Sequence, residues 1–370
     1  MNYINIIIGL LALFFIIQIY YHLRYFTAVS FGKITASKRN NKLPVSVIIA
    51  ARNESSNLQE YLDSILTQEY PNYEVIVVND CSYDNSTDVL KGFSARYKYL
   101  KVVELEEDDK YKHGKKFALT LGIKAASNEH LLFTDADCQP VSKNWIDSMQ
   151  NEFSDAKEIV IGHSPYFKGK GFLNAFARFE TFFTALQYLS FAIRKNPYMA
   201  VGRNMAYTKS LFFKGKGFAS HMHLMSGDDD MFIQQNANAK NTAVCLIEDS
   251  FVYSPAKTSI SDYIRQKLRH LSVGKEYKST HKFSLSMITT SAMLFYVTLI
   301  VGFALQLPYE FTVGFLLARI VLLGVFYFNA MRRLGLKDIF PFYIIFDILY
   351  FLIIPIWAVL ALFTKQKRWK

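Results

Sequence analysis

The chain has 370 residues, of which 51% are hydrophobic, and its formal net charge is +11 at pH 7. Together with a mean hydropathy of +0.11, this hydrophobic share is high for a wholly soluble enzyme and indicates segments that lie in lipid. The basic residues cluster beside apolar stretches, which favours an anionic membrane surface over nucleic acid as their partner. The 3 cysteines have no paired metal-ligand spacing and require no disulfide, in agreement with a reducing cytoplasm.

Four apolar stretches each approach the roughly 20 residues that are needed to cross a bilayer. They cover residues 4–20, 285–305, 311–330 and 339–363. The first carries its basic residues after the apolar run, which argues for a retained anchor rather than a cleaved signal peptide. We therefore expect an N-terminal anchor over residues 1–25, a soluble domain over 40–258 and a C-terminal transmembrane region over 285–364.

Basic residues flank these stretches in three places, between Arg24 and Lys42, at residues 331–337 and in a tail at residues 365–370. The positive-inside rule assigns all three places to the cytoplasm. Four simple crossings, however, would leave the tail outside. Two prolines in the last stretch leave open a re-entrant or broken hairpin there. The expected location is the cytoplasmic membrane, with several crossings and a cytoplasmic soluble domain.

The soluble part alternates between short apolar runs and amphipathic stretches. Residues 45–51 and 75–78 are typical of buried strands, and four apolar residues at helical spacing lie between them. Such a strand-helix-strand unit has parallel strands joined right-handedly. Further strands are expected at residues 100–103 and 131–134, the second preceded by an apolar helical face that includes Gly122. The prediction is an α/β fold around a mostly parallel sheet.

Polar residues follow three of these strands. Arg52 and Glu54 follow the first, Asp80 ends the second, and Asp135 and Asp137 end the fourth. Ligands of open α/β sheets collect at the carboxyl ends of the strands. Side chains at i and i+2 of an extended segment point the same way, so the last two acids would repel one another unless a cation lies between them. A polar turn or a helix cap explains any one of these groups, but a ligand site explains the set better.

Six short motifs together resemble a membrane-bound family 2 glycosyltransferase. In chain order they are VSVIIAARNES, EVIVVNDCSYDNS, KHGKKFAL, FTDADCQP, SGDDDMF and RQKLRH, spread over about residues 44–275. The resemblance implies an inverting enzyme with the GT-A fold, a Rossmann-like nucleotide-sugar-binding domain. It also implies one N-terminal and about three C-terminal transmembrane helices, with amphipathic helices at the membrane surface.

The resemblance gives the strand-end residues roles in binding the donor. The nucleotide sugar would be held by Ala51, Arg52, Glu54, Asp80, Lys115, Asp135 and Ala136. A UDP-sugar is expected, because a carboxylate such as that of Asp80 can accept a hydrogen bond from the N3–H of uracil. Asp135 and Asp137 match the D-x-D of the family and imply a divalent cation, Mn²⁺ or Mg²⁺, as cofactor.

Asp228, Asp229 and Asp230 stand where the family usually has E-D-x-D-L, whose first aspartate is the general base. Aligning Asp-Met with Asp-Leu makes Asp228 the base, whereas aligning the leading acid with Asp228 makes Asp229 the base. We favour Asp228. Acids at the start of a helix are the alternative explanation. A base implies a hydroxyl acceptor and direct displacement with inversion, which argues against a polyprenyl-phosphate acceptor.

Two further segments are expected on the acceptor or diphosphate side. Gln266, Arg269 and His270 correspond to the family's Q-x-x-R-W, with histidine in place of tryptophan, and Arg203 and Asn204 occupy an acceptor-side position. Losing the tryptophan removes a stacking surface for a sugar, which puts processive polymer synthesis in doubt. Residues 259–280 have the pattern of an interfacial amphipathic helix, while a phenylalanine stripe over residues 172–186 leaves core packing and a membrane-surface helix open.

The sequence thus predicts an inverting, metal-dependent glycosyltransferase of the hexosyltransferase type. It would move a sugar from a nucleotide donor to a hydroxyl of a lipid or lipid-linked glycan at the cytoplasmic membrane face, without nucleic acid. A processive polysaccharide synthase is one alternative, for which Arg319 and Asp347 within the apolar stretches could line a channel. A catalytically silent membrane scaffold is the other, and the intact acidic motifs argue against it.

Overall fold

The computed structural model describes residues 3–35, 37, 41–107, 114–224 and 226–363. Its contacts divide the chain into two compact units. The sheet unit comprises the described residues of 34–167 and 195–256, and the helical unit comprises those of 1–33, 168–194 and 257–365. The basic tail expected at residues 365–370 lies outside the described residues.

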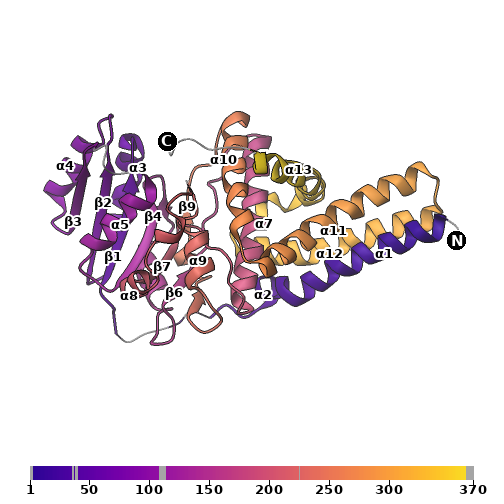
Figure 1. Ribbon diagram of the computed structural model, residues 1–370, viewed down its shortest axis with the longest axis horizontal. Helices are drawn as coiled ribbons and strands as arrows, with labels where there is room; N and C mark the ends of the chain where they lie inside the picture. Colours follow the sequence, from indigo (N-terminus) through magenta and orange to yellow (C-terminus); the bar gives the residue numbers. More distant parts are fainter. Residues whose placement is uncertain (1–2, 36, 38–40, 108–113, 225, 364–370) are drawn as a thin grey trace. The chain divides into compact units, whose positions relative to one another are not determined.

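The sheet unit is built on a seven-stranded sheet with the order β3-β2-β1-β4-β7-β6-β8 (Figure 1). The strands are β1 (Val45–Ala51), β2 (Tyr73–Asp80), β3 (Leu100–Leu105), β4 (His130–Asp135), β6 (Ile159–Ile161), β7 (Met205–Thr208) and β8 (Thr242–Val244). β1 is buried along its whole length and pairs in parallel with both β2 and β4. The four parallel strands expected from the sequence are confirmed, and they form one half of the sheet.

The other half of the sheet departs from the parallel pattern. β7 lies antiparallel between β4 and β6, and β6 pairs in parallel with β8. A small second sheet pairs β5 (Gln139–Pro140) with β9 (Val252–Tyr253). The helices of this unit are α3 (Ser55–Leu66), α4 (Ser86–Arg96), α5 (Lys115–Ala125), α6 (Trp145–Gln150), α8 (Lys209–Lys214) and α9 (Asp230–Asn236).

Helix α5 approaches the sheet most closely at Gly122, which is buried. A Cβ atom added there would lie 2.8 Å from the Ile48 Cγ2 and 3.1 Å from the Val78 Cγ2. The absence of a side chain therefore lets the helix lie directly on β1 and β2. This close packing also fixes the first turn of α5, which carries two lysines, relative to the carboxyl ends of the strands.

The helical unit contains four helices that are long and apolar enough to cross a membrane. Its elements are α1 (Tyr3–Tyr21), a π-helical turn (His22–Phe26), α2 (Thr27–Phe31), α7 (Phe172–Ile193), α10 (Ile260–Val273), α11 (Ser279–Ala304), α12 (Tyr309–Arg333) and α13 (Tyr343–Phe363). The first candidate span, Tyr3–Phe31, extends beyond the apolar stretch of residues 4–20. It continues through the π-helical turn, which carries the basic residue Arg24, to the end of α2.

Helices α1, α11 and α12 run side by side in Figure 1, whereas α13 is seen almost end-on and so runs across them. α13 continues as one helix through Pro355, so the broken hairpin left open for this stretch is not formed. Its side chains pack on α7, where Phe346 and Tyr350 contact the ring of Phe179. The phenylalanine stripe of α7 is consequently core of the helical unit over most of its length.

Buried charges of the helical unit are paired. The Arg319 Nη1 lies 2.5 Å from the Asp347 Oδ2, and Asp347 also accepts hydrogen bonds from the hydroxyls of Tyr296 (2.6 Å) and Tyr327 (3.0 Å). The Nε of the same arginine donates to Gln18 of α1 at 2.6 Å. This network joins α1, α11, α12 and α13. Both charged residues are almost fully buried, so the network has a structural role and holds the four helices together.

We predict that Gly122→Val destabilises the sheet unit while Gly92→Val does not. Gly92 lies on α4 with nothing within 4 Å of an added Cβ, whereas overpacking at Gly122 is expected to lower the free energy of unfolding by about 1–3 kcal/mol. Thermal unfolding of the detergent-solubilised protein, followed by circular dichroism, measures both. Equal midpoints for the two variants would contradict the close packing of α5.

Candidate active site

The carboxyl ends of β1, β2 and β4 lie level with one another. Ala51 of β1 is in register with Asn79 of β2, and Ala50 is in register with Asp135 of β4. Asp80 is therefore one residue beyond that level on β2, and Ala51 lies between the two neighbouring strands. The strand-end residues singled out in the sequence share one edge of the sheet.

The loops after β1 and β2 are tied together by hydrogen bonds. The backbone N–H of Asn53 donates to the Ser82 Oγ at 2.9 Å, and that of Tyr83 donates to the Asn53 Oδ1 at 2.8 Å. The N–H of Ser55 donates to the Asp84 Oδ2 at 2.9 Å. Asn53 has a φ of 55°, a left-handed conformation that asparagine tolerates better than most residues. These contacts make one rigid rim of the two loops.

Arg52 and Glu54 lie on this rim. The guanidinium of Arg52 is 3.9 Å from the Asp80 carboxylate and 3.8 Å from that of Glu107. Asp80 is fully buried and Glu54 nearly so. A buried carboxylate beside an arginine suits recognition of a ring N–H of a nucleobase, although this arrangement alone does not select one base.

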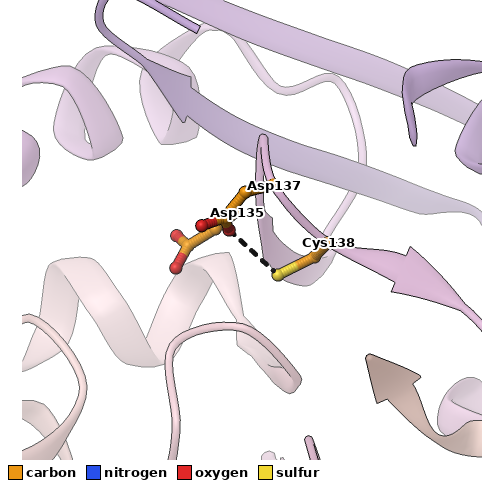
Figure 2. Close-up of side chains that lie close together, drawn as sticks. All are labelled: Asp135, Asp137 and Cys138. Carbon is orange, nitrogen blue, oxygen red and sulfur yellow. Dashed lines mark hydrogen bonds between the residues drawn. The ribbon is translucent and has the colours of Figure 1, made fainter. Parts of the chain in front are cut away.

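The acids of the D-x-D segment lie next to one another at the end of β4, with Cys138 beside them (Figure 2). Ligand atoms of Asp135, Asp137 and Cys138 all lie within 4.8 Å of each other, and the thiol contacts the Asp137 Oδ1 at 3.4 Å. Burial, followed by the charges of the two acids, raises the pKa of Cys138 well above its usual value, so the thiol is neutral at pH 7. The two carboxylates supply hard oxygen ligands, which fit Mg²⁺ or Mn²⁺.

Lys115, at the start of α5, brings the D-x-D segment and the triple-aspartate segment together. Its Nζ lies 2.9 Å from the Asp135 Oδ1 and 3.1 Å from the Asp228 Oδ2. Gly202 lies beside these side chains. A Cβ atom added to Gly202 would lie 3.4 Å from the carboxylates of Asp228 and Asp229. We call Lys115, Asp135, Asp228 and Asp229 the acid–lysine cluster.

The pKa values within the cluster reflect this pairing. Burial would raise the pKa of Asp228, but the neighbouring ammonium of Lys115 outweighs it and the pKa is lowered. For Asp229, burial and then the charge of Asp228 raise the pKa. Burial would lower the pKa of Lys115, but Asp135 and Asp228 raise it above its usual value. At neutral pH, Asp228 is consequently an ionised carboxylate beside an ammonium.

The carboxylate of Asp229 is held by backbone N–H groups. Its Oδ2 accepts from Gly202 at 2.8 Å and its Oδ1 accepts from Asp230, the first residue of α9, at 2.8 Å. This engagement leaves Asp229 a positioning role and leaves Asp228, which pairs with the side chain of Lys115, as the better candidate for a base. Gly202 was not singled out in the sequence, where a lone glycine before Arg203 gives little signal.

The two candidates after β6 and before β7 differ in their surroundings. Asn204 is fully buried, its amide donating to the carbonyls of His163 (2.7 Å) and Ser250 (2.8 Å) and its oxygen accepting from the Trp145 ring N–H (3.0 Å). It therefore supports the site from within the core. Arg203 donates to Ser164 and lies over the ring of Tyr166, with Asp135 among the charges that affect it.

Gln266, Arg269 and His270 lie on α10, which belongs to the helical unit. The role of these three residues on the acceptor or diphosphate side stays a prediction. Lys267 within the same motif is buried and pairs with Glu180 of α7 at 2.9 Å, while Ile260 is exposed. The buried residues of α10 are Tyr263, Lys267 and Val273, and the interfacial position expected for this helix stays a prediction.

Comparison with known proteins gives the class of this site. The model of the family described as glycosyl transferase family 2 matches residues 46–216, which contain β1 to β7 and the D-x-D segment. Residues 46–216 are therefore similar to a glycosyl transferase family 2 domain, and the fold is GT-A-like.

Three curated relatives are similar to parts of the chain. Glycosyltransferase AglE of Haloferax volcanii is 31% identical over 50% of this chain and 58% of its own length. Poly-beta-1,6-N-acetyl-D-glucosamine synthase of Staphylococcus epidermidis is 40% identical over 25% of this chain and 21% of its own. The 4,4'-diaponeurosporenoate glycosyltransferase of Staphylococcus aureus is 30% identical over 37% and 36%. Each alignment thus spans less than two thirds of the relative.

Among solved structures, the mannosyltransferase PcManGT of Pyrobaculum calidifontis, in complex with GDP-Man and Mn²⁺, has a TM-score of 0.59. The superposition covers 95% of this chain and 99% of that chain at 16% identity. At this identity the likeness establishes the fold alone and leaves donor and acceptor to be tested.

We predict that Asp137→Asn weakens Mn²⁺ binding in the presence of a nucleoside diphosphate by roughly tenfold or more, because one of two charged oxygen ligands is lost. Electron paramagnetic resonance of free Mn²⁺ measures this without any turnover. The control is Asp155→Asn, which removes an exposed carboxylate outside the cluster. Equal Mn²⁺ affinity in the two variants would exclude Asp137 as a ligand.

Proposed function

We propose that the protein transfers a sugar, with inversion, from a nucleotide-sugar donor to a hydroxyl of a lipid or lipid-linked glycan at the cytoplasmic face of the membrane. The observation that carries the proposal is the acid–lysine cluster. It places an ionised carboxylate on Asp228 next to Asp135 of the D-x-D segment, with Lys115 between them at 2.9 and 3.1 Å. A base candidate and a metal-ligand candidate thereby share one lysine.

Each residue of the cluster has a defined task in such a transfer. Asp228 would accept the proton of the acceptor hydroxyl as the hydroxyl attacks the anomeric carbon. Asp229, held by two backbone N–H groups, keeps the start of α9 in place. Lys115 offers a cation to the diphosphate of the donor, while the rim formed by Arg52, Glu54 and Asp80 would hold the nucleoside.

Asp135 and Asp137 would hold a divalent cation, Mn²⁺ or Mg²⁺. When bound, such an ion neutralises the charge that develops on the departing nucleoside diphosphate. A UDP-sugar is the first donor to test, and a GDP-sugar the second, because both bases offer ring N–H groups to a buried carboxylate.

A lipid-borne acceptor is supported by the apolar helices and by the exposed Ile260 of α10. A relative named for 4,4'-diaponeurosporenoate and another named for poly-beta-1,6-N-acetyl-D-glucosamine point to different acceptors. For polymer synthesis, Arg319 and Asp347 had been candidates to line a channel. They are instead paired with one another inside the helical unit, and this pairing favours single transfer to a membrane acceptor.

We predict that Asp228→Asn lowers kcat by about 10²–10⁴-fold and leaves binding of the nucleotide donor intact. Asp229→Asn, which retains one acceptor oxygen for a backbone N–H, should lose less activity. The measurement is release of UDP or GDP with Mn²⁺ and a membrane lipid extract, with mass spectrometry of the lipids to detect the added sugar. If Asp229→Asn abolished transfer and Asp228→Asn did not, the assignment of the base would be reversed.

The direction of α13 bears on the orientation in the membrane. Because α13 runs across α1, α11 and α12, we propose that α1, α11 and α12 cross the membrane and that α13 lies along its cytoplasmic surface. The loop between α12 and α13 and the basic tail would then both face the cytoplasm, as the positive-inside rule requires. Three crossings resolve the conflict that four would create.

We predict that a fluorescent protein fused to the C-terminus reports a cytoplasmic position, and that a tag inserted at residues 305–308, between α11 and α12, reports the opposite side. Protease protection in sealed vesicles checks both. A C-terminal fusion on the outer side would show that α13 crosses the membrane as a fourth span.

A further inference from the structure

We infer that Lys116 is a positioning residue that fixes the backbone ahead of Asp228, so that this carboxylate is held ready for the acceptor. The inference rests on the proposed function of Asp228 and deepens it. Lys116 directly follows the lysine of the acid–lysine cluster, but its side chain leaves α5 in another direction and makes a different set of contacts.

The side chain of Lys116 is buried, with 5% of its surface exposed. Its Nζ donates to three backbone carbonyls, those of His221 at 2.6 Å, Leu224 at 3.0 Å and Ser226 at 2.8 Å. The first carbonyl belongs to the last residue of η2 (Ala219–His221), and the other two belong to the segment between η2 and α9. One ammonium therefore binds the end of η2 and two residues of the segment that precedes α9.

Three carbonyl acceptors require three N–H donors, and only the charged form of lysine has three. A neutral amine has two, so one of the three carbonyls would face a nitrogen lone pair. A methionine of similar length would satisfy none of them. The three contacts thus depend on the ammonium itself and not only on a side chain that fills the space.

The last of the three carbonyls is close to the catalytic candidate in sequence. Ser226 is joined to Asp228 by Gly227, which is buried and has a φ of 88°, a conformation that favours glycine. The chain therefore makes a defined turn directly after its contact with Lys116, and this turn directs the Asp228 carboxylate toward Lys115. Backbone motion at Ser226 would reach Asp228 through a single residue, Gly227.

The charged state of Lys116 is sensitive to pH. Burial lowers its pKa to about 8, against the opposing charges of Asp228 and Asp229. The neighbouring His221 does not titrate in that range, because burial, followed by the charge of Lys116, lowers its pKa to about 4. Lys116 consequently loses its third N–H in mildly alkaline solution, where a lysine with the ordinary pKa keeps its proton.

The effect of Lys116 deprotonation on stability distinguishes a local loss of positioning from unfolding of the protein. Because the pKa of Lys116 is lowered in the folded protein, the unfolded chain binds the proton more tightly between pH 8 and the ordinary lysine value. The contribution of this group to the free energy of unfolding therefore rises with pH. A fall in turnover above pH 8 that is caused by Lys116 should appear without a fall in its contribution to stability.

The test compares the wild-type protein with Lys116→Met and with Lys124→Met, which alters an exposed lysine of the same helix. Hydrogen–deuterium exchange of peptides that cover residues 219–232 should be faster in Lys116→Met at pH 7 and unchanged in Lys124→Met. In the wild type, exchange in these peptides should accelerate between pH 7 and 9 beyond the intrinsic base catalysis seen in other peptides. Identical exchange in Lys116→Met and wild type would overturn the inference.

Turnover provides the second readout. Lys116→Met should lower kcat by roughly 10–100-fold, the scale of a misplacement of about 1 Å, with little change in the KM of the donor. The alkaline fall of kcat near pH 8 should be absent from Lys116→Met. A loss confined to KM, or an unchanged alkaline limb, would contradict a positioning role. If no nucleotide sugar is turned over by the wild type, the proposed function fails, while hydrogen exchange still decides whether Lys116 holds the segment.

Discussion

The structure around the candidate site depends on one electrostatic constraint, the crowding of carboxylates at the carboxyl edge of a parallel sheet. Two unit charges 4 Å apart interact by about 4 kcal/mol at an effective dielectric constant of 20, so carboxylates gathered at one edge require a counter-charge. Lys115 supplies that charge from the start of α5. Its position in turn requires α5 to lie close to the sheet, which Gly122 permits.

The helical unit obeys the same constraint in a less polar setting. A charge without a partner is far more costly away from water, and the described charges at Arg319 and Lys267 each have a carboxylate partner, Asp347 and Glu180. In the first case four helices converge on the pair, and in the second α10 is fastened to α7. Both pairs are buried inside the helical unit.

The sequence was sufficient for the parallel half of the sheet, because each strand there is a continuous apolar run that ends in a polar residue. It was also sufficient for the acids at those ends, since strand register alone brings Asp80 and Asp135 to one edge. It was insufficient for β6 to β9, which are two to four residues long and too short for a periodic pattern. Nor could it distinguish the roles of Lys115 and Lys116, because these depend on the segment between η2 and α9, whose path no local pattern specifies.

The resting arrangement of the cluster also explains how a carboxylate with a lowered pKa could act as a base. While Lys115 lies against Asp228, the carboxylate is ionised but weakly basic. In the proposed transfer, a donor diphosphate would compete for the same ammonium, and displacement of Lys115 toward the phosphates would remove the cause of the lowered pKa. The basicity of Asp228 would then increase when a donor is present, provided that its backbone does not follow the lysine. Lys116 meets that condition, because it anchors the preceding segment through carbonyls that take no part in the exchange.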